Sequence, residues 1–237
     1  MSILAAKNSK LWIGACAVTA ASGILYFLTA ARDIVVGDSP ELITAAATLG
    51  VAHEPGYPLF TMLGHVFSLV PIGTIPFRVN LLSVVCDAFA VGVTYLAAAR
   101  LTKSQLSAAI AAMLLAINMN FWEWSLAAEV FPLNNLLAGV LVLLLIAWYE
   151  WPQRGVFLIG AFFIAGLGFT NQQTIVLLGP AFAFVLWRRR ATLLACPVLL
   201  AIGAIAFLIG LLPYVYIPWA SSHHPVYNWG TVSSFPI

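Results

Sequence analysis

The feature that most constrains this chain is a series of long apolar runs that contain almost no charge. Charged residues make up 8% of the 237 residues and apolar residues 62%. A soluble domain carries roughly 25% charged residues, because its surface must stay solvated by water. Lipid must therefore be the solvent for most of this chain. The sequence predicts an integral membrane protein and excludes an ordinary soluble domain.

The apolar runs predict an all-α polytopic protein with about seven transmembrane helices, because a helix needs about 20 apolar residues to cross a bilayer. The runs cover residues 11–31, 77–99, 104–118, 132–149, 155–170, 172–187 and 191–217. The first run is longer than the apolar region of about 7–15 residues in a cleaved signal peptide, so we expect it to be retained as an anchor. All of residues 1–237 are assigned to a single transmembrane domain.

The basic residues predict the orientation, because cytoplasmic loops carry an excess of Lys and Arg. With a cytoplasmic N-terminus and about seven spans, only Arg32 and Arg78 of the ten basic residues face the outer side. The C-terminus then lies outside. The outer side also receives most of the acidic residues, namely Asp33, Asp38, Glu41, Glu54, Glu123 and Glu129. Acidic residues contribute little to topology, so this outer acidity is the first indication of a functional site.

The first outer loop, residues 32–76, is predicted to contain a helix that lies on the membrane surface. Ser39 is a favourable N-cap, Pro40 a favourable first helical residue and Gly50 a natural stop. The apolar piece 59–70 is too short to cross the bilayer, so we expect it to be re-entrant or interfacial.

Asp38 and Glu41 lie near the positive end of that predicted helix. They can be acids that only favour the helix start, or two carboxylates of a general-base site. His53 and Glu54 follow, just before a Pro-Gly-Tyr-Pro turn. A structural turn is the simpler explanation for that pair.

Several motifs together resemble a known family. They are GDSPE at 37–41, TLGVAHEPGYPL at 48–59, FRVNLLS at 77–83, EVFPLNN at 129–135, GLGFTNQQT at 166–174 and YNWG at 227–230. The chain resembles a bacterial multi-pass membrane family, formerly of unknown function. Its animal relatives are transmembrane protein O-mannosyltransferases of the C-type glycosyltransferase superfamily. The first two motifs are the most specific.

The resemblance implies a GT-C-like fold and a membrane glycosyltransferase. Such an enzyme would move a sugar, such as mannose, from a polyprenyl-phosphate carrier to an acceptor hydroxyl, without a cofactor. The acceptor can be a protein, a glycan or a lipid. The location implied is a bacterial inner membrane, with the active side facing away from the cytoplasm. A different class of function stays open, namely a transporter, a lipid flippase or an assembly partner without catalysis.

The resemblance also implies roles for individual residues. Asp38 is expected to be the catalytic base, with Glu41 as its partner. Substrate-binding positions are expected at His53, Glu54, Tyr57, Arg78, Asn80, Glu129, Asn134 and Asn171. Arg78 would hold the carrier phosphate, a task that suits its planar fork of donors. Interfacial snorkelling is the alternative for Arg78, and hydrogen bonding between helices is the alternative for Asn134 and Asn135.

Three features depart from the family pattern. Glu54 stands where a second proline is expected, and Gln172 and Gln173 stand where histidines are expected. The sequence ends at Ile237, whereas related architectures continue through further spans, which predicts a short form or a fragment.

Asp87 lies near the middle of the second span, where an acidic residue costs about 2.5–3.5 kcal/mol to insert. We expect it to be protonated or hydrogen-bonded to another span, and a role in proton-coupled transport is the alternative. His223 and His224 have no further ligands at zinc spacing, so no metal site is expected. The cysteines are expected to be small buried hydrophobic residues.

Overall fold

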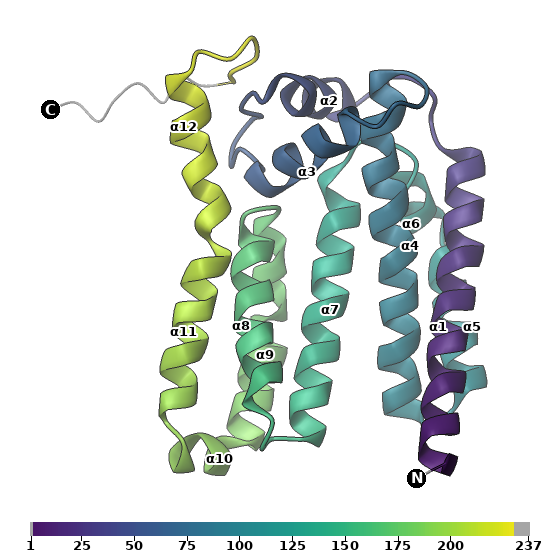
Figure 1. Ribbon diagram of the computed structural model, residues 1–237, viewed down its shortest axis with the longest axis vertical. Helices are drawn as coiled ribbons and strands as arrows, with labels where there is room; N and C mark the ends of the chain where they lie inside the picture. The colour runs from purple at the N-terminus through teal and green to yellow at the C-terminus, as the bar shows by residue number, and fades with distance from the viewer. Residues whose placement is uncertain (1, 230–237) are drawn as a thin grey trace, which may run out of the picture.

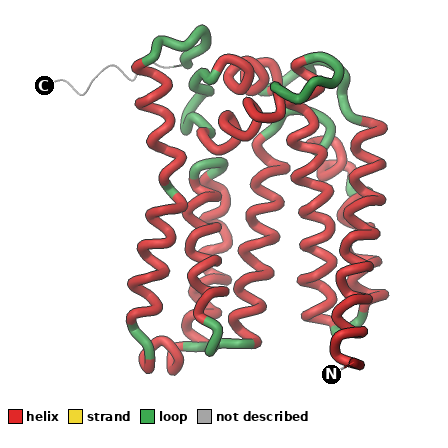
Figure 2. The backbone as a smooth tube through the Cα atoms, viewed as in Figure 1, coloured by secondary structure: helices red, strands yellow, loops and turns green. Residues whose placement is uncertain are grey.

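The computed structural model describes residues 2–229, with side chains from residue 9 onward, and this part of the chain is helical without any β-strand (Figures 1 and 2). The long helices are α1 (Ser2–Thr29), α4 (Ile75–Thr102), α7 (Val130–Glu150), α8 (Gly155–Phe169) and α11 (Val198–Gly210). Shorter ones are α2 (Ser39–Thr48), α3 (Pro58–Ser68), α5 (Gln105–Ala116), α6 (Met119–Trp124), η1 (Gln173–Leu178), α9 (Gly179–Arg188), α10 (Arg190–Ala195), η2 (Leu212–Val215) and α12 (Tyr216–Ser222). The expectation of an all-α protein is therefore confirmed.

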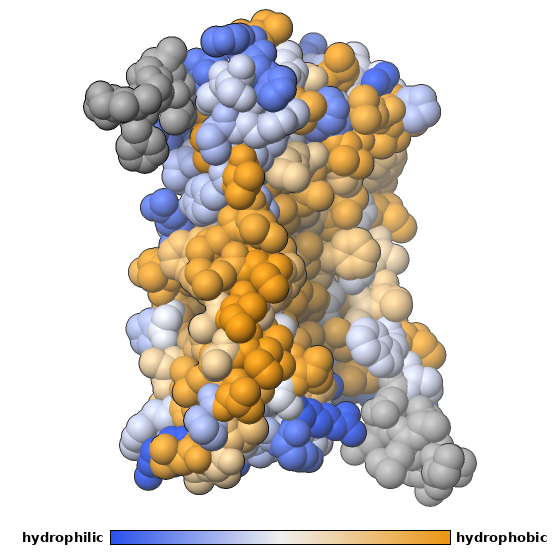
Figure 3. All heavy atoms as spheres, turned by 60° about the vertical axis from the view of Figure 1, so that its left-hand side comes forward, coloured by the Kyte–Doolittle hydropathy of each residue, from blue (hydrophilic) through white to orange (hydrophobic). Residues whose placement is uncertain are grey.

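The helices form a bundle with two distinct ends (Figure 1). α2 and α3 lie across one end, which we call the capped end, and α12 rises beside them. The N-terminus, α10 and the connection from α4 to α5 lie at the other end, which we call the basic end. The surface of one face is apolar in its middle and hydrophilic at both ends (Figure 3). This distribution is typical of a protein whose middle lies in lipid.

Four helical segments are long and apolar enough to cross a membrane. They are Ser9–Thr29, Ile75–Thr102, Val130–Glu150 and Val198–Ser222. The apolar helices α5, α8 and η1–α9 are shorter than these four segments, and they lie alongside them in Figure 1. An integral membrane protein is thus confirmed, whereas the count of about seven spans stays a prediction. The predicted run 191–217 is interrupted at Cys196 and Pro197, where α10 ends and α11 begins.

The first outer loop follows its prediction closely. α2 ends at a left-handed Leu49, followed by Gly50, and α3 occupies most of the short apolar piece without crossing the bundle. One detail was wrong, because the N-cap of α2 is Asp38 and Ser39 is already helical. The burial of the cysteines was also predicted only in part: Cys86 is buried, but Cys16 and Cys196 are exposed on the protein surface.

The basic end gathers the charges that the topology prediction placed together. Glu150 accepts hydrogen bonds from Arg100 at 2.8 Å and from Lys103 at 3.0 Å. Arg189, at the junction of α9 and α10, donates to the backbone carbonyl of Tyr149. These contacts tie the ends of α4, α7 and α9 together. The side of the membrane that this end faces stays a prediction.

α8 and α11 approach each other through two glycines. A Cβ added to Gly166 would lie 2.2 Å from the carbonyl oxygen of Phe207, and one added to Gly210 would lie 2.4 Å from that of Phe163. Small residues of this kind let the backbones of membrane helices come close, where packing rather than water exclusion drives association. The α8–α11 contact therefore depends on the absence of side chains at these two positions.

We expect Gly166→Ala to lower the melting temperature of the detergent-solubilised protein, because the new methyl group forces α8 and α11 apart. Overpacking of this type costs about 1–3 kcal/mol, which exceeds the gain of up to about 1 kcal/mol from replacing a helical glycine. Gly179→Ala is the matched control, because nothing lies within 4 Å of its added Cβ. Equal melting temperatures for the two variants would contradict the close-packing interpretation.

Candidate functional site

The carboxylate of Asp38 is exposed at the N-terminus of α2 on the capped end. Its backbone carbonyl accepts a hydrogen bond from Leu42 at 2.9 Å, but its side chain makes no capping hydrogen bond. Within the described residues, this carboxylate has no hydrogen-bond or ion-pair partner. The side chain therefore does not cap α2 through a hydrogen bond.

Glu41, one turn further along α2, holds the loop that leads to α3. Its Oε1 atom lies 3.0 Å from Nδ1 of His53 and also accepts the backbone N–H of His53. Nε2 of His53 lies 3.1 Å from the hydroxyl of Tyr57. A carboxylate can only accept, so Nδ1 carries the proton, and in the neutral ring Nε2 accepts from Tyr57. The structure thus joins three predicted site residues in one series of hydrogen bonds, which we call the Glu41–His53–Tyr57 chain.

The chain near residue 228 closes over the same loop. Val51 donates its N–H to the carbonyl of Tyr227 at 3.1 Å, and Trp229 donates to the carbonyl of Val51 at 3.0 Å. The Trp229 ring meets the His53 ring edge-on, with their centroids 6.0 Å apart. Of the YNWG motif, Gly230 lies outside the described residues. The motifs at 48–59 and 227–230, which lie far apart in the sequence, therefore meet here.

Glu129 is the N-cap residue of α7. Its side chain is buried, with 5% of the residue exposed, and Oε1 would lie 3.9 Å from a Cβ added to Gly37. Burial and the nearby Asp38 carboxylate raise the pKa of Glu129 to about 7, although a hydrogen bond from Val130 N–H and the proximity of His53 counteract part of the rise. A carboxyl group that titrates near neutral pH is suited to proton transfer.

Burial, together with the charges of Asp38, Glu41 and Glu129, also raises the pKa of the Tyr57 hydroxyl. Tyr57 therefore stays protonated and continues to donate to His53. The same three charges act on one hydroxyl, so the acids at 38, 41 and 129 all lie near Tyr57.

Asn80 is buried, and it fixes both loops that supply the acids. Its Nδ2 donates to the carbonyls of Ala31 at 2.9 Å and Asp33 at 3.2 Å, and its Oδ1 accepts the N–H of Ala128 at 2.8 Å. The predicted position of Asn80 near the site is thus observed, but all of its observed bonds are to backbone groups. It connects the segment before Asp38 to the segment before Glu129.

Two further residues on the same face of α4 hold the segment around Glu129. Ser83 accepts the N–H of Glu129 at 3.4 Å. Asp87 accepts from Ser125 at 2.8 Å and from Asn135 at 3.1 Å, which confirms the expectation of a hydrogen-bonded acid. Asn135 therefore makes the predicted contact between helices. Sequence reasoning overlooked Ser83 and Ser125, although the spacing of 80, 83 and 87 already places those three on one face of a helix.

Asn171 and Asn134 lie on the other side of the α7 N-terminus. Nδ2 of Asn171 donates to the carbonyl of Val130 at 2.9 Å, so this residue also holds the start of α7. The Oδ1 atoms of Asn171 and Asn134 are buried without a hydrogen-bond partner within the described part of the chain.

Arg78 and Glu54 make no hydrogen bond or ion pair with the other predicted site residues in the described part of the chain. The guanidinium group of Arg78 donates to the carbonyls of Ser68 at 3.1 Å, Ile72 at 2.8 Å and Gly73 at 3.0 Å, and thereby ties the turn between α3 and α4. Glu54 is exposed and has no hydrogen-bond or ion-pair partner among the described residues.

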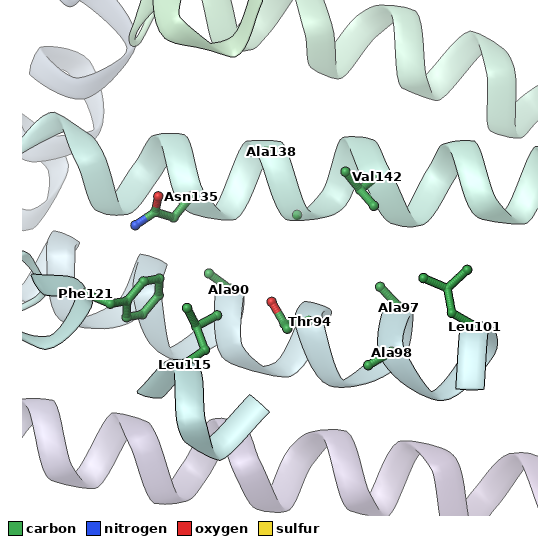
Figure 4. A pocket seen from close by; sticks show the side chains of 11 residues that line it. Ala90, Thr94, Ala97, Ala98, Leu101, Leu115, Phe121, Asn135, Ala138 and Val142 are labelled. Atoms are coloured by element: carbon green, nitrogen blue, oxygen red, sulfur yellow. The ribbon is translucent and has the colours of Figure 1, made fainter. Parts of the chain in front are cut away.

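A cavity of about 450 Å³ lies between α4, α5 and α7, on the side of Asn135 that faces away from Glu129 (Figure 4). Only Thr94 and Asn135 make its lining polar; the remaining residues are Ala90, Ala97, Ala98, Leu101, Leu115, Phe121, Ala138, Gly139 and Val142. The cavity extends along α4 toward the basic end. It offers no charged group to a substrate.

Comparison with known proteins shows the family of the chain. A family model described as the Protein O-mannosyl-transferase TMEM260 N-terminal domain matches residues 38–195, which begin at Asp38. The chain belongs to this family. It is 41% identical over 217 residues to Protein O-mannosyl-transferase TMEM260 of Mus musculus, covering 88% of this chain and 30% of the relative.

A second relative is Protein O-mannosyl-transferase tmem260 of Dictyostelium discoideum, 30% identical over 230 residues, with 89% of this chain and 28% of the relative covered. The chain thus spans less than a third of the length of these two relatives. No solved structure matches the chain. The family membership supports the O-mannosyltransferase part of the resemblance seen in the sequence.

The raised pKa of Glu129 predicts a pH dependence of stability. The folded protein binds this proton more tightly than the unfolded chain does, so its contribution to stability is present below pH 4.5 and is lost as the pH rises through about 7. We expect Glu129→Gln to be more stable than the original protein at pH 8, by roughly 3 kcal/mol or less, and to match it near pH 4.5. Melting temperatures in detergent at the two pH values check this.

Glu123→Gln is the matched control for that measurement, because Glu123 is exposed on α6 and its side chain has no partner among the described residues. Its melting temperature should follow that of the original protein at both pH values. If Glu129→Gln also follows the original protein, the burial of a titrating carboxyl at this position is contradicted.

Proposed function

We propose that this chain supplies the acidic site of a membrane mannosyltransferase. The enzyme moves mannose from a polyprenyl-phosphate carrier to an acceptor hydroxyl on the non-cytoplasmic side. The observation that carries the proposal is the unpartnered Asp38 carboxylate on the capped end, surrounded by Glu129 and by the Glu41–His53–Tyr57 chain. The names of the two relatives, both protein O-mannosyl-transferases, support mannose as the sugar and protein as the acceptor class.

Asp38 acts as the base in this proposal. The acceptor oxygen attacks the anomeric carbon, the bond from that carbon to the carrier phosphate breaks, and the hydroxyl proton passes to Asp38. A carboxylate that is bound neither to a cation nor to the helix N-terminus is free to accept this proton. The start of α2 holds it still, because Pro40 and the buried Ser39 fix the first turn.

Glu41 serves as the partner of Asp38 through the loop that it organises. One oxygen of Glu41 is occupied by both nitrogen donors of His53, which leaves the other oxygen as an acceptor for a substrate hydroxyl. His53 and Tyr57 line the proposed substrate site next to Glu41. The buried acceptors on Asn134 and Asn171 supply further positions for sugar hydroxyls.

The carrier phosphate is assigned to Arg78. Three of the five guanidinium N–H groups are used by carbonyls of the turn before α4, which leaves two for a phosphate. The guanidinium of Arg32 lies 4.3 Å from the Phe77 ring centroid, so both outer arginines lie at the start of α4. A phosphate of a membrane-embedded carrier would reach this level of the bundle from the lipid.

The capped end is assigned to the non-cytoplasmic side and the architecture to the GT-C type. The gathering of Arg100, Lys103 and Arg189 at the opposite end supports this orientation. The transporter alternative is less well supported, because both oxygens of Asp87 are engaged by Ser125 and Asn135 and hold α6 and α7 in place.

We expect Asp38→Asn to reduce transfer by about 10²–10⁴-fold, because the amide keeps the shape but cannot accept the proton. The measurement supplies labelled polyprenyl-phosphate mannose and a serine/threonine peptide to membranes that contain each variant. Asp33→Asn is the matched control, since Asp33 is exposed in the same loop and its side chain bonds only the N–H of its neighbour Ile34 within the described structure. A folded Asp38→Asn protein with near-normal transfer would contradict the assignment of Asp38 as the base.

We expect Arg78→Lys to raise the KM for the phosphate-linked donor at least severalfold, because a lysine keeps the charge but loses the planar fork. Peptide KM should stay unchanged. Melting temperature is measured alongside, since the turn carbonyls of Ser68, Ile72 and Gly73 also lose their donors. A fall in stability with an unchanged donor KM would limit Arg78 to the turn and remove it from the phosphate site.

A further inference from the structure

Another cavity, of about 570 Å³, opens at the basic end between α4, α7 and α9, and we call it the basic-end cavity. Leu101 and Val142 line both this cavity and the one in Figure 4, so the two adjoin. Its volume lies within the usual range for small-molecule sites, about 300–1,000 Å³. The function proposed above makes no use of it.

The lining of the basic-end cavity is divided into a charged end and an apolar part. Arg100, Lys103 and Glu150 form the charged end. Leu101 of α4 is 67% exposed and Phe184 of α9 is 55% exposed, so the apolar part is open to the lipid around the bundle. The other apolar residues come from α7 and α9, namely Val142, Leu145, Ile146, Ala181 and Val185.

The apolar part is about as long as one leaflet of a bilayer is thick. The lining residues of α7 run from Val142 to Glu150 at positions i, i+3, i+4, i+7 and i+8, so they share one face of the helix. At 1.5 Å per residue this face is about 12 Å long. Half the hydrocarbon core of a bilayer is about 15 Å. A molecule with its polar group at the charged end would therefore keep its apolar portion within one leaflet.

The charged end carries an excess of positive charge. Arg100 and Lys103 share the single carboxylate of Glu150, at 2.8 Å and 3.0 Å, so one positive charge is not compensated. The Lys103 side chain is 74% exposed and uses one of its three N–H groups in this contact. A third cation, Arg189, lies with its guanidinium 4.3 Å from the ring centroid of Tyr149, which also lines the cavity. Donors and charge therefore remain for an anion at this end.

We propose that the basic-end cavity binds an anionic phospholipid, with its phosphate at Arg100 and Lys103 and one acyl chain along the apolar faces of α7 and α9. The excess of positive charge selects the anionic headgroup, and the open apolar part accommodates the chain. The topology rule for basic residues explains cations at this end, but it does not explain an apolar cavity that leads away from them. This site is separate from the acidic site and does not depend on the reaction proposed there.

The experiment titrates dioleoyl phosphatidylglycerol into the purified chain in a neutral detergent and counts bound lipid by native mass spectrometry. Dioleoyl phosphatidylcholine, which has the same chains and no net charge, is titrated in parallel. We expect one saturable phosphatidylglycerol molecule and about fivefold weaker binding of phosphatidylcholine, which is the usual effect of one basic residue on an anionic lipid. Equal affinity for the two lipids would overturn the proposal.

Two charge variants locate the headgroup. Lys103→Gln should weaken phosphatidylglycerol binding about fivefold, because one cation of the charged end is lost. Glu150→Gln should tighten it, because Arg100 and Lys103 lose the carboxylate that competes with the phosphate. Lys10→Gln is the matched control, since Lys10 is an exposed cation of α1 that does not line the cavity. Equal effects of Lys103→Gln and Lys10→Gln would indicate general charge attraction and overturn the proposal.

Two bulky variants test the place of the acyl chain. Ala181→Phe should fill the apolar part and weaken phosphatidylglycerol binding at least severalfold. Ala183→Phe adds the same bulk to the same helix outside the lining and should leave binding unchanged. Melting temperatures without added lipid verify that each variant is folded. Undiminished binding by folded Ala181→Phe, or displacement of the lipid by inorganic phosphate alone, would contradict a phospholipid held in this cavity.

Discussion

The fixed geometry of the capped end depends on one interaction above all, the docking of the segment 125–135 onto a polar face of α4. In the apolar interior of a membrane protein, a polar group cannot form its hydrogen bonds with water. Asn80, Ser83 and Asp87 therefore find their partners in the protein, and those partners are the turn before α7 and α7 itself. The same Asn80 binds the segment that leads to Asp38. A single helix face thus aligns the two segments that carry the acids of the site.

This arrangement separates a rigid frame from an accessible surface. Asn80, Asp87 and Asn171 are buried and bonded within the protein, whereas Asp38 is exposed and its carboxylate has no bond within the described chain. Glu41, His53 and Tyr57 lie between these extremes, partly buried and bonded to each other. Such a gradient suits a site in which a supporting frame holds the reacting groups still while the substrate reaches them from the membrane surface.

The sequence alone allowed much of the fold to be predicted. Apolar runs placed α4 and α7 to within a few residues, because a lipid solvent leaves little choice but helices. The end of α1 was placed equally well, but this helix already begins at Ser2, before the predicted run. The helix in the first outer loop was predicted from Ser39, Pro40 and Gly50, and only its N-cap was misplaced by one residue. The break at Cys196 and Pro197 was not anticipated, because hydropathy does not register where an apolar segment changes direction. The GT-C architecture and the count of spans stay predictions.

For the site, the sequence determined the chemical groups, since the motifs around Asp38, His53 and Glu129 indicated a family in which an outer loop carries the acids. The sequence could not determine which groups would be bound to one another. Tertiary structure decided that Glu41 holds His53, that Arg78 ties a turn, and that Asn80 and Asp87 support the start of α7. It also placed the Glu129 side chain beside Gly37, the residue before Asp38, although the two lie far apart in the sequence. The physical reason is that hydrogen bonding and charge interaction fall off over a few ångströms, whereas sequence motifs give only the order of residues along the chain.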